Sequence, residues 1–194
     1  FSIQTEGAFR WQAAEFQLKI GSMKIWLTDQ FTMPLPAGHR FPFGRYRLLR
    51  EAVVAQLALP AACYAVPRAI TADELAVAHA EPWISRVLQH ELTPKEVRRL
   101  GFPWSPELVQ RTLHTTMATV EAARGALNEG LGINLAGGTH HAFADHGEGY
   151  CIFNDSAVAI RLLQAAGLIR RALVLDLDVH QGNGTAAIFT GDAS

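Results

Sequence analysis

Short apolar runs alternate with longer helical patterns through most of this sequence, and that alternation restricts the chain to few folds. Runs of this kind predict strands at 24–28, 62–66, 133–136 and 172–178. The spacing of apolar residues between them predicts helices at 44–57, 106–130 and 156–166. Pro106 suits the first turn of its helix and Gly130 suits its end. Strand, helix and strand in this order predict an α/β fold with a parallel sheet and helices on both faces.

Composition narrows the class of protein. With 194 residues, 49% of them hydrophobic and 18% charged, the chain can bury the core of one domain. The net charge of -1 gives no reason to expect a nucleic-acid partner, and no apolar run reaches the length of a membrane span. Cys63 and Cys151 are far apart in apolar surroundings, which favours reduced, buried thiols in a cytoplasmic protein over a disulfide or a thiolate ligand.

The first 22 residues are expected to stand apart from the rest. They lack an initiating Met, and Met23 follows a Gly-Ser pair directly before the first predicted strand. We expect 1–22 to be a non-native or upstream extension, and a native N-terminal arm is the alternative. The segment also lacks the basic and apolar regions of a signal peptide.

A polar residue stands at every second position from Asp176 through Asp178 to His180, with apolar residues between. Because a strand turns successive side chains to opposite faces, these three share one face. Zinc accepts carboxylate oxygen and imidazole nitrogen, and a catalytic zinc keeps a position open for water. Asp178 and His180 are therefore the expected zinc ligands, while Asp176 would orient a neighbouring imidazole or hold a monovalent cation.

A second polar cluster, His140 and His141 after two glycines, also follows an apolar run. By themselves these histidines could be ordinary hydrogen-bonded residues. Since ligands gather at the carboxyl ends of parallel strands, the two clusters together predict one shared site for metal-assisted hydrolysis. A dinuclear manganese hydrolase of the arginase type would carry a further aspartate where this chain has Gly182, so one catalytic metal is expected.

Three motifs resemble one family. GGTHHAF at 137–143, GEGYCIFND at 147–155 and LDLDVHQGNGT at 175–185 are similar to the zinc-dependent histone deacetylases and their bacterial relatives, including the acetoin-utilisation and acetylpolyamine deacetylases. Weaker similarity lies at 39–51 and 101–108. The resemblance implies that 23–194 is the N-terminal part of a deacetylase domain with an arginase/deacetylase-like fold whose C-terminal portion is missing.

The resemblance also assigns metal ligands and catalytic groups. Asp178 and His180 would bind zinc, and the tandem histidines His140 and His141 would activate water and protonate the leaving amine. Asp176 would hydrogen-bond His140 and help to hold a structural potassium ion. The third zinc ligand, an aspartate, and the tyrosine that polarises the acetyl carbonyl are expected beyond position 194.

Further expected residues come from the same resemblance. Gly149 and Tyr150 match the pair that lines the acyl-lysine tunnel, although Phe is commoner at the second position. Asn183 stands where some branches have Asp, and it would pair with His141 and tune its proton affinity.

The expected function is hydrolysis of an acetyl or short acyl group from a lysine side chain or a similar amine. Acetylated protein, acetylpolyamine and a small-molecule amide are all open as substrates. The alternative is a catalytically incomplete fragment that serves only as a folded binding or assembly module. An unpaired sheet edge and exposed apolar faces would also favour homo-oligomers.

The remaining histidines and tryptophans are given structural interpretations. His79, His90 and His114 lie in helical or polar surroundings and are predicted on solvated faces. Trp83 and Trp104 are predicted to be packing residues.

Overall fold

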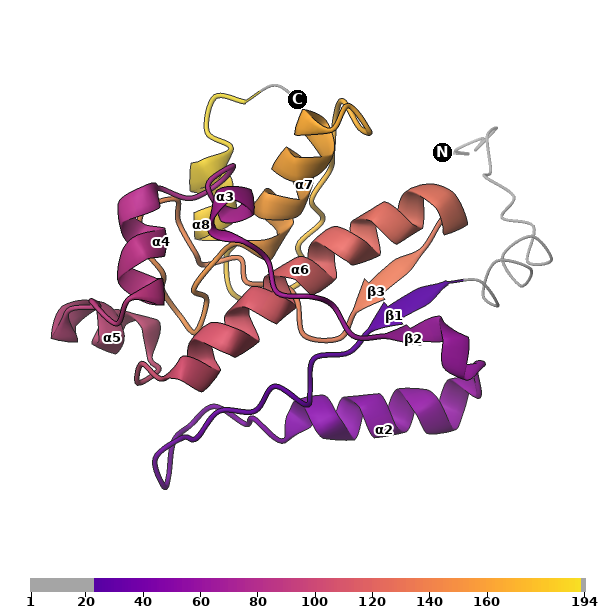
Figure 1. The fold of residues 1–194 in the computed structure, drawn as a ribbon, viewed down its shortest axis with the longest axis horizontal. Coiled ribbons are helices and arrows are strands. Elements are labelled where there is room, and N and C mark those ends of the chain that lie inside the picture. The colour runs from indigo at the N-terminus through magenta and orange to yellow at the C-terminus, as the bar shows by residue number, and fades with distance from the viewer. Residues whose placement is uncertain (1–22, 193–194) are drawn as a thin grey trace, which may run out of the picture.

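The computed structural model describes residues 23–192, in which a short parallel sheet lies among helices (Figure 1). Strands β1 (Lys24–Trp26), β2 (Tyr64–Ala65) and β3 (Gly132–Asn134) form the order β2-β1-β3. Ile25 in the central strand pairs with both neighbouring strands and is fully buried. The three strands are shorter than predicted but lie at or beside their predicted positions. The predicted segment 1–22 falls outside the described residues.

The three predicted helices form close to their predicted bounds. They are α2 (Arg45–Leu57), α6 (Pro106–Glu129) and α7 (Asp155–Ala165). Ser105 caps α6 by accepting a hydrogen bond from the Leu108 amide, and Gly130 ends that helix in the left-handed conformation. Within residues 23–192, five further helical segments lie outside the predicted helix ranges: a 3-10 turn at Ala61–Cys63, α3 (Ala72–Leu75), α4 (Glu81–Leu88), α5 (Pro94–Leu100) and α8 (Asn183–Ile188).

The layers follow from which helices carry apolar faces. Helix α6 packs against β1 and β3, and α7 packs against α6. The strands lie between this pair and α2, whose side chains are all at least partly exposed (Figure 1). The main core joins α4, α6 and α7, and its fully buried members include Trp83 and Phe153. The packing prediction for Trp83 is confirmed.

The prediction of a strand at 172–178 is wrong, because these residues form no strand. The segment is irregular, and Leu173, Leu175 and Leu177 are 90%, 75% and 85% exposed. Two amides bond to side chains instead of a neighbouring strand: Asp176 Oδ1 accepts from the Asp178 amide at 3.0 Å, and Asp178 Oδ1 accepts from the His180 amide at 2.8 Å. Such local bonds compete with a strand ladder. The alternation of apolar and polar faces nevertheless persists.

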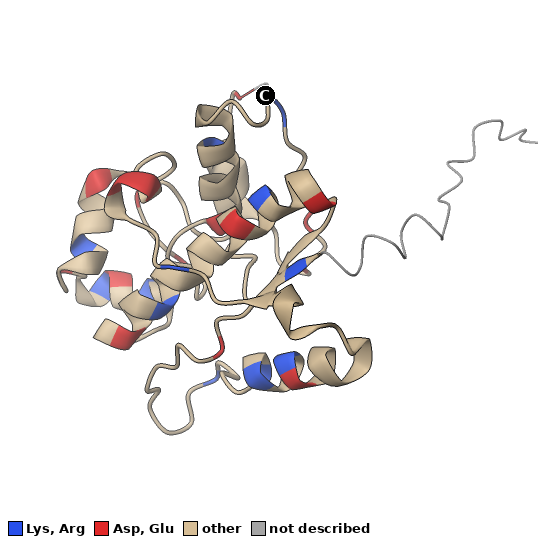
Figure 2. Ribbon diagram, turned by 45° about the vertical axis from the view of Figure 1, so that its right-hand side comes forward, with Lys and Arg blue, Asp and Glu red and all other residues tan. Residues whose placement is uncertain are grey.

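Charged residues of both signs are mixed along the helices. Figure 2 shows acidic and basic residues side by side on α2, α4 and α5, where Arg47 pairs with Glu51 and Arg86 with Glu96. Among the described residues, no helix is both long and apolar enough to cross a membrane.

Candidate active site

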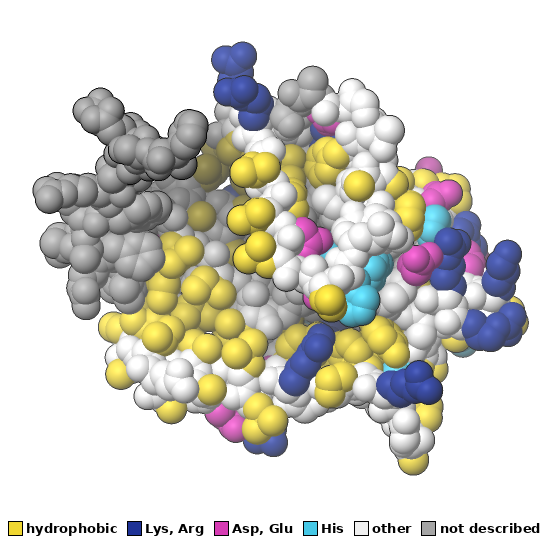
Figure 3. All heavy atoms as spheres, turned by 180° about the vertical axis from the view of Figure 1, so that it is seen from behind, with side chains coloured by type: hydrophobic (Ala, Val, Ile, Leu, Met, Phe, Trp, Pro, Cys, Tyr) yellow, Lys and Arg dark blue, Asp and Glu magenta, His cyan; other side chains and the backbone are white. Residues whose placement is uncertain are grey.

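A hollow of about 470 Å³ collects most of the predicted site residues. We call it the histidine hollow; its lining includes Phe41, Tyr46, Thr139, His140, His141, Gly149, Tyr150, Asp178 and His180. Viewed from behind, the molecule shows histidine side chains at the surface between acidic and hydrophobic groups (Figure 3). The two polar clusters, about forty positions apart in the sequence, therefore meet in one place, as the shared-site prediction required.

Asp176 lies behind the hollow and holds His140. His140 Nδ1 donates to Asp176 Oδ2 at 2.6 Å, and this hydrogen bond is the main cause that lowers the pKa of the Asp176 carboxyl. Since the carboxylate accepts from Nδ1, the other ring nitrogen of neutral His140 carries the lone pair. The geometry matches the orienting interaction expected for Asp176.

Asn183 fixes His141 in the same way. His141 Nδ1 lies 2.7 Å from Asn183 Oδ1, at the start of α8, so an amide oxygen here does what a carboxylate does for His140. The two rings lie with centroids 4.2 Å apart. Both imidazoles are thus oriented by an oxygen on Nδ1, with Nε2 left for chemistry.

Asp178 and His180 lie side by side on the wall of the histidine hollow. Asp178 Oδ1 accepts from His180 Nδ1 at 2.8 Å, and bonds from the His180 backbone and ring lower the pKa of the Asp178 carboxyl. The pair supplies oxygen and nitrogen donors of the kind that zinc takes. Within residues 23–192, no group of three or more His, Cys, Asp or Glu side chains is arranged to hold a metal ion.

A buried carboxylate, which sequence reasoning missed, positions the tandem histidines. Asp155, 1% exposed at the first turn of α7, accepts from the amides of Gly138 and Thr139 at 2.9 Å each and from Thr119 Oγ1 at 2.6 Å. A Cβ at Gly137 would lie 2.8 Å from Asp155 Oδ2, so the glycine lets the loop approach the carboxylate. The only sequence signal was its place at the end of the GEGYCIFND motif.

A tight turn presents Gly149 and Tyr150 to the hollow. Glu148 and Cys151 bond to each other in both directions through their backbones, and the two residues between them have φ of 54° and 68°. Such an angle is strained for a tyrosine. A Cβ at Gly149 would come within 2.8 Å of the His141 ring, so this position needs glycine for the imidazole to fit.

Tyr150 belongs to an aromatic wall. Its ring lies 5.0 Å from that of Phe41 and 4.8 Å from that of Phe102, centroid to centroid. The contact with Phe41 brings the loop before α2 to the site. His39 joins this wall by bonding through Nε2 to the Gly101 carbonyl at 2.8 Å.

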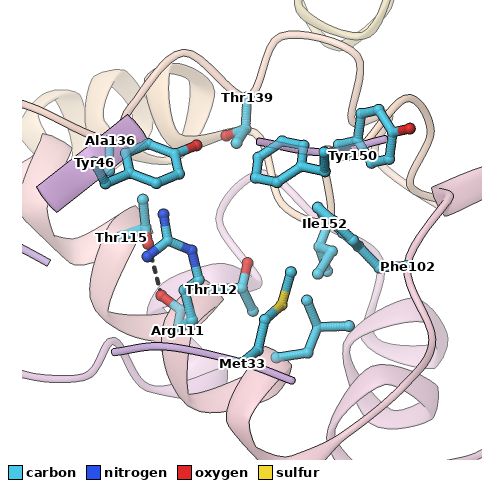
Figure 4. A pocket seen from close by; sticks show the side chains of 12 residues that line it. Met33, Tyr46, Phe102, Arg111, Thr112, Thr115, Ala136, Thr139, Tyr150 and Ile152 are labelled. Atoms are coloured by element: carbon cyan, nitrogen blue, oxygen red, sulfur yellow. Dashed lines mark hydrogen bonds between the residues drawn. The ribbon is translucent and has the colours of Figure 1, made fainter. Parts of the chain in front are cut away.

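A smaller cavity borders the histidine hollow, and the buried side chain of Arg111 forms part of its wall (Figure 4). Arg111 of α6 is 7% exposed and donates to the carbonyls of Thr28 and Phe31. Its guanidinium lies 4.6 Å from the centre of the Phe43 ring and 4.3 Å from that of Tyr46. Burial lowers the pKa of Arg111. Carbonyls and aromatic faces compensate the charge and tie α6 to the loop after β1.

His79 corrects one interpretation from the sequence. It was predicted on a solvated face, but it is 4% exposed, and its Nε2 accepts a hydrogen bond from the backbone amide of Asn154 at 2.9 Å. Burial lowers its pKa to about 4. The side-chain Nδ2 of Asn154, the residue that caps α7, donates to Thr185 Oγ1 in α8 at 2.9 Å. By fixing the backbone of Asn154, a neutral His79 helps to hold α8 against α7.

The cysteines are buried as predicted. Cys63 and Cys151 are not joined in a disulfide, and their exposures are 3% and 7%. Burial raises the pKa of the Cys151 thiol to about 12. A thiol of that kind stays protonated and does not act as a nucleophile.

The fold and the site define an α/β protein in which two histidines, each oriented through Nδ1 by a side-chain oxygen, lie in one polar hollow with Asp178 and His180. Comparison with known proteins makes this specific, since residues 39–194 match the model of the histone deacetylase domain. The chain belongs to the histone deacetylase family.

Two relatives with curated sequences are similar to this chain. An uncharacterized protein of Picosynechococcus sp. is 43% identical over 162 residues, which cover 84% of this chain and 54% of that protein. A probable deacetylase of Methanothermobacter thermautotrophicus is 33% identical over 144 residues, covering 66% of this chain and 44% of that protein. The chain therefore spans about half the length of such relatives.

Solved structures support the fold. The crystal structure of an HDAC homolog from Aquifex aeolicus superposes with a TM-score of 0.72 at 27% identity, over 87% of this chain and 48% of that one. The arginase/deacetylase-like prediction of the fold is confirmed.

Proposed function

We propose that this protein is a zinc-dependent hydrolase that removes an acetyl or short acyl group from a lysine side chain or a similar amine. The observation that carries the proposal is the pair His140 and His141 in the histidine hollow, each held through Nδ1 by a side-chain oxygen. Family membership supports deacetylation as the reaction class.

Zinc would be held by Asp178 and His180 together with a ligand outside the described residues. When bound, the metal polarises the amide carbonyl and lowers the pKa of water. The donor types of the two residues fit zinc. The carboxylate of Asp176 is the group proposed to help hold potassium, through oxygens that also bond to His140.

The chain's own residues would move the protons. With Nδ1 fixed, the Nε2 atoms of the tandem histidines are free to take a proton from water and to return one to the leaving amine. Asp176 stabilises the charge that develops on His140, and Asn183 orients His141. The two histidines differ in the partner of Nδ1, which is a carboxylate for His140 and an amide oxygen for His141, so only His140 has a charged group behind it.

Gly149 and Tyr150 would form the wall along which the acyl-lysine side chain enters. The aromatic rings around Tyr150 offer an apolar surface to the methylene groups of lysine. Acetylated protein, acetylpolyamine and small-molecule amides all present such a chain or a similar one. The two buried cysteines, which form no disulfide with each other, favour a reducing, cytoplasmic location.

The second candidate is a catalytically incomplete module that only binds or assembles. It is favoured by the finding that no three metal-binding side chains converge within residues 23–192. A module of this kind would bind zinc weakly, because each ligand contributes strongly to affinity.

The test is hydrolysis of a fluorogenic acetyl-lysine peptide, with added zinc, by the full-length natural protein that contains these 194 residues. We expect turnover that His140→Ala and Asp178→Ala abolish. Turnover unaffected by both substitutions would contradict the proposed site. If that full-length protein shows no turnover and binds zinc only weakly, the result favours the catalytically incomplete module.

A further inference from the structure

Asn183 can orient His141 only if its own amide points the right way. The amide has an oxygen and an NH2 group of nearly equal size, and a half-turn exchanges them. With the oxygen toward His141, the ring keeps its proton on Nδ1. With the NH2 group toward His141, Nδ1 must accept and the proton moves to Nε2, the nitrogen needed as a base.

Glu148 stands on the other side of Asn183. Asn183 Nδ2 donates to Glu148 Oε1 at 3.3 Å, and a carboxylate can only accept, so the NH2 group of Asn183 must face it. The oxygen is thereby left for His141. Glu148 is absent from the lining of the histidine hollow, and its side chain reaches His141 through Asn183.

Glu148 is held from two directions. Arg99, at the end of α5, donates through Nε to Glu148 Oε2 at 2.7 Å. The backbone of Glu148 is fixed by its two bonds to Cys151, and the Arg99 carbonyl accepts from the Gly149 amide at 3.2 Å. The bond from Arg99 is the main cause that lowers the pKa of the Glu148 carboxyl, so the acceptor is present at neutral pH.

We infer that Glu148, clamped by Arg99, is a positioning residue that sets the amide orientation of Asn183 and through it the tautomer of His141. The inference rests on the proposed function, since it names what orients one of the two proposed catalytic histidines. It also explains the amide at position 183: an aspartate there would face the Glu148 carboxylate, and two neighbouring carboxylates repel.

The structure predicts a reciprocal pair of substitutions. In Glu148→Gln, the new side-chain oxygen stays on Arg99, which offers only donors, and the new NH2 group faces Asn183. Asn183 must then turn its oxygen away from His141. In the double variant Glu148→Gln/Asn183→Asp, the new carboxylate accepts from both neighbours, so the Nδ1 proton of His141 is restored.

The first readout is activity on an acetyl-lysine peptide. We expect Glu148→Gln to lower kcat by about 10–100-fold with KM nearly unchanged, in keeping with the usual effect of residues behind a metal-site histidine. The double variant should recover most of the loss, and Asn183→Asp alone should not equal wild type. Glu51→Gln removes an exposed glutamate paired with Arg47 and should match wild type.

The second readout does not depend on activity. Long-range 1H–15N NMR spectra at one alkaline pH give the tautomer of each imidazole, with His141 assigned from a His141→Gln sample. We expect the Nδ1–H tautomer in the wild type and the double variant, and the Nε2–H tautomer in Glu148→Gln. A wild-type tautomer and a wild-type kcat in Glu148→Gln would overturn the inference, as would a double variant no better than the single one.

The two proposals fail in different ways. If no variant and no wild-type sample hydrolyses an acyl-lysine peptide, the proposed function is wrong, and the tautomer pattern alone decides the inference. If the wild type is active but the tautomer does not respond to Glu148→Gln, the inference is wrong and the proposed function stands.

Discussion

The Asp176 carboxylate fills the space that a side chain at Gly182 would need: a Cβ at this glycine would lie 2.6 Å from Asp176 Oδ2. The same oxygen accepts the hydrogen bond from His140 Nδ1. The sequence marked Gly182 as a position where an aspartate would indicate a second metal. The structure gives the glycine a further reason, which is space for the carboxylate that orients His140.

The first prediction concerns this contact. Gly182→Ala should push the Asp176 carboxylate away from His140 and lower kcat by about 10²-fold, the usual effect of a displacement near 1 Å at a reacting group. Peptide hydrolysis measures it. Gly125→Ala is the matched control, because nothing lies within 4 Å of a Cβ at that helical glycine. Equal activity of the two variants would contradict the prediction.

Asp176→Asn tests what orients His140, because the new side chain has nearly the same shape as the old one. The two oxygens of Asp176 accept from His140 Nδ1 and from the Asp178 amide, so an asparagine must set its NH2 group against one of these donors. Where the NH2 group faces Nδ1, the imidazole proton moves to Nε2, and a wrong tautomer in a catalytic histidine costs about 10⁴ in kcat in the serine-protease example. We expect a loss of at least about 10²-fold in kcat. A loss seen only in KM would mean that Asp176 acts on binding and not on His140.

Asp155→Asn should destabilise the fold. The buried carboxylate accepts from Gly138, Thr139 and Thr119, and an NH2 group facing such donors leaves buried groups unpaired. We expect the free energy of unfolding to fall by about 3 kcal/mol, measured by urea denaturation. Asp73→Asn, at an exposed position of α3, should change it little. A change at Asp155 no larger than at Asp73 would show that the bonds to the Asp155 carboxylate do not stabilise the fold.

The sequence predicted the parts of the site whose signal is local. His140 with His141, and Asp178 with His180, stand in short motifs, and the alternation around Asp176 correctly placed polar groups on one side. Residues that act through distant partners gave no such signal. Asp155 meets Thr119 and Glu148 meets Arg99 across 36 and 49 positions, and no periodicity reports contacts of that kind.

Elements of the fold, too, were predicted where their signal is local and missed where they depend on distant residues. Helices α6 and α7 carry their own caps and apolar faces, so their residues alone indicate them. The segment 172–178 has a strand pattern, but a strand also needs a neighbour for its backbone, and here the Asp176 and Asp178 side chains take two of its amides. His79 was misplaced because the backbone amide that bonds to its ring, that of Asn154, lies 75 positions further along the chain.

His79 should make stability depend on pH. Burial lowers its pKa to about 4 from 6.5. Between these values the unfolded chain binds a proton that the folded protein does not, so the free energy of unfolding falls as the pH drops from near 7 toward 4. A difference of this size is worth up to about 3 kcal/mol.

The measurement is urea unfolding as a function of pH for the wild type and His79→Gln, whose side-chain oxygen can still accept from Asn154. The slope between these pH values should be smaller in the variant. His90→Gln, at an exposed position, should keep the wild-type slope. Identical slopes in all three proteins would show that His79 does not titrate as its burial requires.

The exposed apolar side of 173–179 should drive self-association of this chain. Leu175, Leu177 and Val179 are 75%, 85% and 92% exposed, and apolar groups gathered in this way favour burial against another surface. We expect Leu175→Lys/Leu177→Lys to shift the chain toward monomer in sedimentation velocity. Val66→Lys, at another apolar residue that is 56% exposed, is the matched control and should leave the distribution unchanged. A wild-type chain that stays monomeric at every concentration, or an equal effect of both changes, would show that this surface does not associate.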